Sequence, residues 1–380
     1  FLIASTALLR YILSLHGSPS EKTINGKEHF PMDFENYLLE QIQMHPALQP
    51  QDIWKLCYQA AFGPEHLLSD PQGAREYLEK EYEATEEQDV PLYEPISDEI
   101  CRVNLAAWKF RGLPVEWLFR IFAASCGKGA DGEALFWAYL QRAEQVLSGG
   151  SVGFSRDDWK AYALSRQEAG LSPVHHSAYY RQQEKPAYRI VNRKFVRLFP
   201  ILQKAAEKIS RDKVCVIAID GRAASGKTTM ANLLQEILEA DVIRMDDFFL
   251  PPALRTEERF QQAGGNVHYE RFQAEVLPCL SLQAAFSYRI FDCGRMDYHG
   301  EREIGTAKIR IVEGSYSCHP LFGNYADITV FSHVDGETQL QRIRKRNGEE
   351  MAKMFRDRWI PLEEAYFHAY QIADKADMRL

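Results

Sequence analysis

Eight residues near the middle of the chain have the types and the spacing of a phosphate-binding loop. Gly221, Gly226, Lys227 and Thr228 occupy the fixed positions of the pattern G-x-x-x-x-G-K-S/T. Glycines let the backbone turn closely around an anion, and the N–H groups of such a loop point inward. The lysine of this pattern reaches the β- and γ-phosphates of a nucleotide, and the hydroxyl ligates Mg²⁺. The loop therefore predicts a magnesium–nucleotide site, and the motif leaves open whether ATP or GTP is preferred.

The segments on either side of the loop fit this prediction. Residues 214–219 are apolar and rich in β-branched side chains, as in a buried parallel strand. Apolar residues recur at helical spacing over 230–240. Strand, glycine loop and helix are the context that the motif requires. The other loop residues predicted to line the nucleotide site are Ala223, Ala224, Ser225 and Thr229.

Acidic residues follow the next predicted strand, 241–245. Asp246 and Asp247 stand at its carboxyl end, where ligands bind in open α/β sheets. A carboxylate there can accept the proton of a substrate hydroxyl as the hydroxyl attacks a γ-phosphate. An aspartate pair that caps a turn is the alternative.

A third acidic residue and a basic helix add to the candidate site. The predicted strand 309–313 ends on Glu313, which is placed to hold the shell of the Mg²⁺ ion. Residues 326–331 indicate one more buried strand. Arg342 and Arg346 lie one turn apart on a predicted helix that could close over phosphates and neutralise their charge. A solvated basic helix is the alternative.

Residues 213–380 resemble the uridine kinase/phosphoribulokinase group of P-loop small-molecule kinases. The resemblance implies a parallel five-stranded sheet with helices on both faces. It also implies MgATP as phosphate donor, a small-molecule hydroxyl as acceptor, and Asp246 as the catalytic base. The stretches that carry the resemblance are 221–228, 246–249, 264–272, Glu313-Gly314 and the helix from Arg342.

The chain departs from this group where substrate would bind. Asn266 to Glu270 replaces the Asn-Phe-Asp-His-Pro of uridine kinases, which puts His268 or Tyr269 near the substrate-contacting aspartate of the family. The Tyr-Asp segment of the family is matched only loosely by residues 291–293. A nucleoside, a sugar and a vitamin-like alcohol are therefore equally open as acceptors. The candidate substrate contacts are Asp247, His268, Tyr269 and Arg295, with a structural role as the alternative for His268.

The composition is that of an ordinary globular protein. Its 380 residues are enough for two cores, and its net charge of −8 argues against general binding of nucleic acid. The seven cysteines include no C-x-x-C pair, which favours reduced thiols. The apolar start of the chain is too short to span a bilayer and has no basic leader. We expect a cytoplasmic protein with a small-molecule partner and no membrane partner; the oligomeric state is not predicted.

The regions before the loop are predicted to be helical. Residues 1–31 are expected to form a helix and linker left from an upstream region, and 32–200 a mainly α-helical domain before the P-loop domain, 210–380. Little strand signal is present. A last helix, 198–210, leads into the first strand of the P-loop domain. The other helices are expected over 34–45, 51–61, 72–83, 97–110, 115–124 and 132–147.

Two polar clusters in this first half could bind an anion or move a proton. One contains Glu65 and His66 after a Gly-Pro turn, and the other contains His175, His176 and Arg189. Helix capping and interface packing are the alternative. Three functions therefore stay open: a small-molecule kinase, which leads, a nucleotide-gated regulatory module, and a bifunctional enzyme whose helical domain has its own activity.

Overall fold

The computed structural model describes residues 34–380, apart from 65–69, 127–131, 150–151 and 210–212. The helix and linker predicted over 1–31 lie outside the described residues. So do Glu65 and His66. The described residues belong to one compact unit, Met32–Leu380.

Helices form most of the N-terminal half, as predicted. Six of the expected helices are confirmed to within about two residues at each end, the usual precision of helix boundaries. The helices are α2 (Phe34–Met44), α3 (Pro50–Phe62), α4 (Pro71–Ala84), α5 (Leu105–Phe110), α6 (Val115–Ser125), α7 (Gly132–Gly149), α8 (Arg156–Ala169), α9 (Ala178–Glu184) and α10 (Phe199–Lys208), with a 3₁₀ helix η2 (Arg193–Leu198) before α10.

A small antiparallel sheet in this half was not predicted. It has the order β1 (Tyr93–Pro95), β2 (Ile100–Asn104), β3 (Tyr188–Asn192). The helix predicted over 97–110 is therefore wrong in its first half. The first four residues of β2 are buried, so the strand lacks the polar alternation that marks a half-exposed strand. Helix α5 begins only after Asn104, whose side chain accepts a hydrogen bond from the backbone N–H of Ala107.

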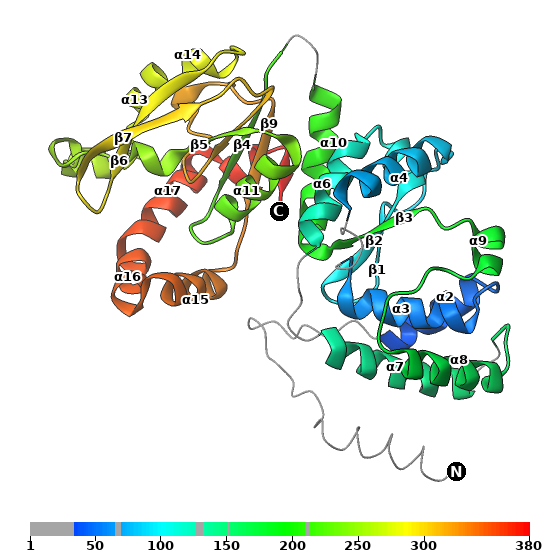
Figure 1. The fold of residues 1–380 in the computed structure, drawn as a ribbon. Helices are drawn as coiled ribbons and strands as arrows, with labels where there is room; N and C mark the ends of the chain where they lie inside the picture. The colour runs from blue at the N-terminus through cyan, green and yellow to red at the C-terminus, as the bar shows by residue number, and fades with distance from the viewer. Residues whose placement is uncertain (1–33, 65–69, 127–131, 150–151, 210–212) are drawn as a thin grey trace. The chain divides into compact units, whose positions relative to one another are not determined.

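The C-terminal half contains a parallel five-stranded sheet of order β10-β9-β4-β8-β5 (Figure 1). All four predicted strands are confirmed. Their apolar side chains are buried within this sheet. The strands are β4 (Cys215–Gly221), β5 (Asp241–Arg244), β8 (Ile309–Glu313), β9 (Ile328–Ser332) and β10 (Met378–Arg379). Every pairing in the sheet is parallel, which brings the carboxyl ends of β4, β5 and β8 to one edge.

Helices and one hairpin surround this sheet. The hairpin of β6 (Phe286–Asp292) and β7 (Asp297–Ile304) was not predicted. Figure 1 shows α15, α16 and α17 following one another as a single arm. The remaining elements are α11 (Lys227–Leu238), η3 (Met245–Phe248), η4 (Pro252–Leu254), α12 (Glu257–Gln261), α13 (Tyr269–Glu275), α14 (Leu277–Leu280), η5 (Pro320–Phe322), α15 (Gly336–Asn347), α16 (Glu349–Met354), η6 (Phe355–Trp359), α17 (Ile360–Tyr370) and α18 (Ile372–Lys375).

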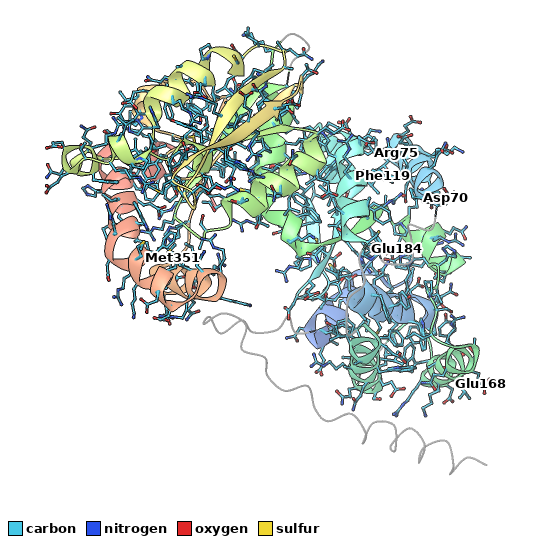
Figure 2. The ribbon with its side chains drawn as sticks, turned by 60° about the vertical axis from the view of Figure 1, so that its left-hand side comes forward. Asp70, Arg75, Phe119, Glu168, Glu184 and Met351 are labelled. Carbon is cyan, nitrogen blue, oxygen red and sulfur yellow. The ribbon has the colours of Figure 1, made fainter. Side chains whose placement is uncertain are left out.

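The two predicted domains share a continuous apolar core. One cluster of buried side chains includes Phe122 and Leu202 of the helical half together with Ile217 and Leu234 of the P-loop half. Farther from the P-loop half, the guanidinium of Arg75 stacks at 4.6 Å on the ring of Phe119, which Figure 2 shows beside it. Burial of apolar surface on α11 thus joins the phosphate-binding loop to the preceding helices.

Candidate active site

The phosphate-binding loop connects β4 to α11, as the motif predicts. Gly221 ends β4 with φ of +137°, and a Cβ there would lie 2.1 Å from the backbone oxygen of Ser332. Gly226 has φ of +100°. Both positions therefore require glycine, one for its close approach to β9 and both for their backbone angles.

A buried carboxylate that the sequence reasoning missed holds the base of the loop. Asp220 accepts hydrogen bonds from the N–H of Gly221 at 2.7 Å, of Tyr316 at 3.1 Å and of Cys318 at 2.9 Å. The hydroxyl of Tyr366 donates to it at 2.8 Å. Burial raises the pKa of Asp220. The only signal in the sequence was an acidic residue inside an apolar strand.

The lysine and the threonine of the loop lie next to the end of β8. Lys227 Nζ donates to the carbonyl oxygens of Gly221 at 2.7 Å and Arg222 at 2.8 Å. The hydroxyl of Thr228 donates to Glu313 at 3.3 Å. This pair of oxygen ligands fits Mg²⁺, which takes one or two protein ligands and completes its shell with phosphates and water. No cluster of three or more metal-binding side chains occurs within the described residues.

The candidate base lies in the same cavity as the loop. Asp246 is accessible to solvent but lies within the cavity, and it has no hydrogen bond or ion pair within the described part of the chain. Desolvation raises the pKa of Asp246, against the lowering effect of the charge of Lys227. Glu313, by contrast, is buried. Burial and the charge of Asp246 raise the pKa of Glu313, which pairs with Arg244 at 2.7 Å. A free carboxylate with raised pKa is suited to accept a proton near neutral pH.

Helix α17 holds the loop through a second residue that the sequence did not indicate. Glu363 accepts the N–H of Ala223 at 3.0 Å and the hydroxyl of Ser315 at 2.9 Å, and burial raises its pKa. Glu364 pairs with Arg222 at 2.7 Å. Because α17 continues the arm that carries the arginine helix, the loop and that arm are joined by direct hydrogen bonds.

The two arginines of the basic helix reach this cavity from α15. Arg342 donates to the carbonyl oxygen of Ala224 at 3.1 Å, and Arg346 also lines the cavity. Figure 2 marks Met351, another lining residue, on the following helix α16. Closure of this arm over a nucleotide remains a prediction.

The cavity has a volume of about 690 Å³. Ser225 is buried in the loop and does not line it. The predicted residues that the structure brings together at its wall are Ala223, Ala224, Gly226, Lys227, Thr228, Thr229, Asp246, Glu313, Arg342 and Arg346.

The four predicted substrate contacts are not at the cavity wall. Asp247 is buried and pairs with Arg302 at 2.8 Å, so its carboxylate joins η3 to the unpredicted hairpin. Tyr269 stacks on His319 with 5.2 Å between ring centroids, and His268 caps α13. Arg295 is exposed and donates to His299 at 3.2 Å. Asp247, His268 and Tyr269 thus have contacts within the fold, and a role of the four residues in substrate binding stays a prediction.

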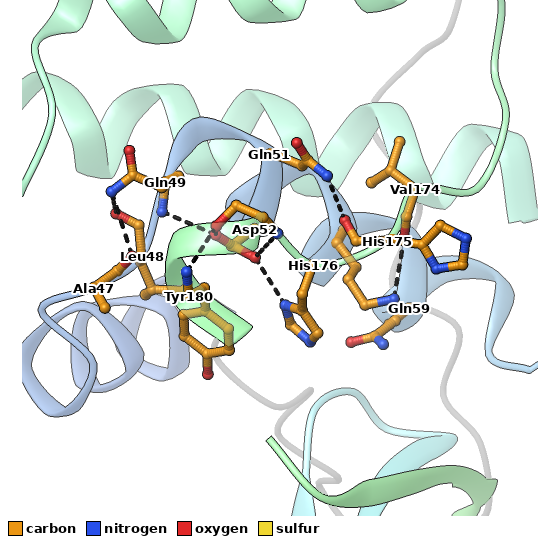
Figure 3. A network of polar contacts seen from close by, with 12 residues as sticks. Ala47, Leu48, Gln49, Gln51, Asp52, Gln59, Val174, His175, His176 and Tyr180 are labelled. Carbon is orange, nitrogen blue, oxygen red and sulfur yellow. Dashed lines mark hydrogen bonds and ion pairs between the residues drawn. The ribbon is translucent and has the colours of Figure 1, made fainter. Parts of the chain in front are cut away.

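The polar cluster of the helical half forms a closed network (Figure 3). His176 Nδ1 lies 2.8 Å from Asp52, and its Nε2 is hydrogen-bonded to the hydroxyl of Tyr188. Desolvation lowers the pKa of His176 to about 4, although Asp52 opposes that shift. Gln59 donates to Tyr188 at 3.2 Å and accepts from buried Arg102 at 3.1 Å. The lowered pKa favours the neutral imidazole, which links Asp52 of α3 to Tyr188 of β3 through its two nitrogens.

The other members of this cluster lie outside the network. Arg189 pairs with Glu81, and His175 is exposed. No helix in the described ranges is both long and apolar enough to cross a bilayer.

Solved structures that are similar to this chain include three that cover about half of it, the C-terminal half. No protein-family model and no curated protein matches the chain. A possible uridine kinase from Bacillus stearothermophilus is 20% identical, with 49% of this chain and 99% of that chain covered and a TM-score of 0.39. A proposed fructose transport system kinase from Silicibacter sp. TM1040 is 21% identical, with 48% and 98% covered and a TM-score of 0.41. The YGR205w protein is 14% identical, with 49% and 91% covered and a TM-score of 0.35.

Proposed function

We propose that the chain is an ATP-dependent kinase that transfers the γ-phosphate to a hydroxyl group of a small molecule. The observation that carries the proposal is the position of Asp246. Its carboxylate is free, and it lines the same cavity as Lys227 and Thr228 of the phosphate-binding loop. A protein that only binds nucleotide has no need of a base beside the phosphate site, whereas phosphate transfer to an alcohol does.

Six residues that line the cavity have a task in this reaction. The loop N–H groups and Lys227 bind the β- and γ-phosphates, and Lys227 leaves its two carbonyl partners to do so. Thr228 and Glu313 would hold Mg²⁺, which would supply positive charge to neutralise the phosphates. Asp246 accepts the proton of the acceptor hydroxyl. Arg342 and Arg346 stabilise the charge of the transferred group and help to exclude water.

The test is release of ADP from MgATP by the purified chain in the presence of nucleosides, sugars, polyols and hydroxy acids. Release that rises sharply with one compound, together with a phosphorylated product detected by mass spectrometry, is the expected result. Slow release that no compound changes, with no phosphorylated product, would contradict the proposal.

A nucleotide-gated regulatory module is the second candidate, and one observation favours it. Arg120 of α6 pairs at 2.8 Å with Glu239, directly after α11, and donates to the carbonyl of Ile237. The first helix after the phosphate-binding loop is thus tied to the helical half. A module of this kind would change the hydrogen exchange of α6 when MgATP binds, without any phosphorylated product. A kinase gives the product whether or not α6 responds.

A further inference from the structure

The cavity has a second side that the transfer of phosphate alone does not explain. The loop, Arg342 and Arg346 form the side that faces the phosphates. The acceptor has to lie on the other side of Asp246, because its hydroxyl must reach that carboxylate. The cavity is also lined by side chains that have no task in holding the nucleotide, namely Phe249, Arg255, Phe260, Cys293 and Met296, and we assign these to the acceptor side.

Arg255 brings an unbalanced positive charge to this second side. Its Nε donates to the carbonyl oxygen of Leu250 at 2.8 Å, which fixes the guanidinium directly after η4. Arg244 and Arg302 each pair with a carboxylate, at 2.7 and 2.8 Å. Arg255 has no such ion pair within the residues that the structure describes. A guanidinium in a partly apolar cavity is stabilised when an anion binds it.

Arg255, Asp246 and Cys293 line the same cavity. The charges of both Arg255 and Asp246 act on the thiol of Cys293. Burial raises the pKa of this thiol, while Arg255 lowers that pKa and Asp246 raises it. A small acceptor with its hydroxyl at Asp246 is therefore within reach of Arg255.

We propose that Arg255 binds a carboxylate of the acceptor, which makes the acceptor a hydroxy acid. This inference rests on the proposed kinase function and narrows its substrate class. A guanidinium matches the two oxygens of a carboxylate with parallel hydrogen bonds. One guanidinium balances one negative charge, and the nearby charge of Asp246 disfavours a dianionic phosphate ester. The apolar side chains of Phe249, Phe260 and Met296 suit the carbon chain of such an acid.

Alkylation of Cys293 tests the carboxylate site without any kinase assay. Iodoacetate carries a carboxylate and iodoacetamide is its neutral counterpart. In both reactions the Cys293 thiolate forms an S–C bond while the C–I bond breaks and iodide leaves. Peptide mass spectrometry gives the rate at which each reagent alkylates Cys293. A change in the pKa of the thiol affects both rates alike, so the ratio of the iodoacetate rate to the iodoacetamide rate measures the attraction of the carboxylate alone.

We expect Arg255→Gln to lower this ratio about three- to tenfold, as loss of a charge-assisted hydrogen bond implies. Arg289→Gln is the matched control, since Arg289 is exposed on β6 and pairs with Glu275. An unchanged ratio in Arg255→Gln would overturn the inference. The inference would also be overturned if added phosphate monoesters slowed the alkylation of Cys293 more than added carboxylic acids did.

The kinase assay gives the second measurement and separates the two proposals. With the native chain, ADP release should rise with a hydroxy acid and not with its amide. In Arg255→Gln, the KM for the acid should rise about 10- to 100-fold while the KM for ATP is unchanged. Active neutral acceptors with an unchanged KM in the variant would refute the role of Arg255 and leave the kinase intact. A positive alkylation result without any phosphorylated product would refute the kinase and leave the carboxylate site.

Discussion

Replacing Asp246 by Asn separates the transfer of phosphate from the binding of nucleotide. A general base contributes about 10²- to 10⁴-fold to a rate, so kcat should fall by that factor. Asp246 has no hydrogen-bond partner within the described residues, so the amide leaves no donor or acceptor newly unpaired. The free energy of unfolding should therefore change by no more than about 0.5 kcal/mol. Removal of a negative charge beside the phosphates should leave the Kd for MgATP unchanged or lower it.

The pH dependence of the same pair of proteins adds an independent measurement. Burial raises the pKa of Asp246, so the native kcat should fall, as the pH is lowered, at a higher pH than an exposed aspartate with a pKa of about 3.9 would allow. The variant should lack this acidic decline. Stopped assays of the phosphorylated product give kcat, and isothermal titration calorimetry gives the Kd for ATP.

The control for this substitution is Asp374→Asn, an exposed aspartate on α18. It should leave both quantities unchanged. If the Asn variant keeps kcat within about threefold of the native value, the loss is far smaller than the loss of a general base would cause, and Asp246 is not the base. Equal losses of kcat and of ATP affinity would show that the side chain acts on the nucleotide instead.

Three further predictions concern the loop and the helical half. Lys227→Met should weaken binding of MgATP about 10- to 100-fold, measured by calorimetry, and unchanged binding would contradict its contact with phosphate. Gly221→Ala should lower the free energy of unfolding by about 3 kcal/mol or more, because its Cβ meets the backbone of Ser332 at 2.1 Å. Urea unfolding measures this change, and Gly336→Ala, with no atom near its Cβ, is a control that should differ little from native. The pKa of His176 is lowered to about 4 in the fold. Its contribution to the free energy of unfolding should therefore be fully present above about pH 6.5 and should decline toward pH 4, by at most about 1.4 kcal/mol per pH unit. Equal pH slopes for native protein and His176→Gln would contradict this.

The sequence by itself determined the loop, the parallel strands beside it and most of the helices. The spacing of Gly221, Gly226 and Lys227 is local, and so are the apolar runs of the strands and the periodicity of the helices. The formation of these elements can therefore be predicted without knowledge of contacts between distant parts of the chain. The placement of Asp246 and Glu313 at one edge also follows, because parallel strands end on the same side of a sheet.

Only the tertiary structure decided which polar side chains face the cavity. Asp246 and Asp247 are adjacent in sequence. Asp247 accepts a hydrogen bond from Arg302, which lies 55 positions later in the hairpin of β6 and β7. Asp246 has no such partner within the described residues. Asp220 and Glu363 bind the loop from separate elements, and Arg255 lines the cavity without an ion pair to any described residue. These roles depend on pairings between distant segments, and such pairings leave no periodic signal in a single sequence. Strand β2 was missed for a related reason, since burial of both its faces removes the alternation by which strands are recognised.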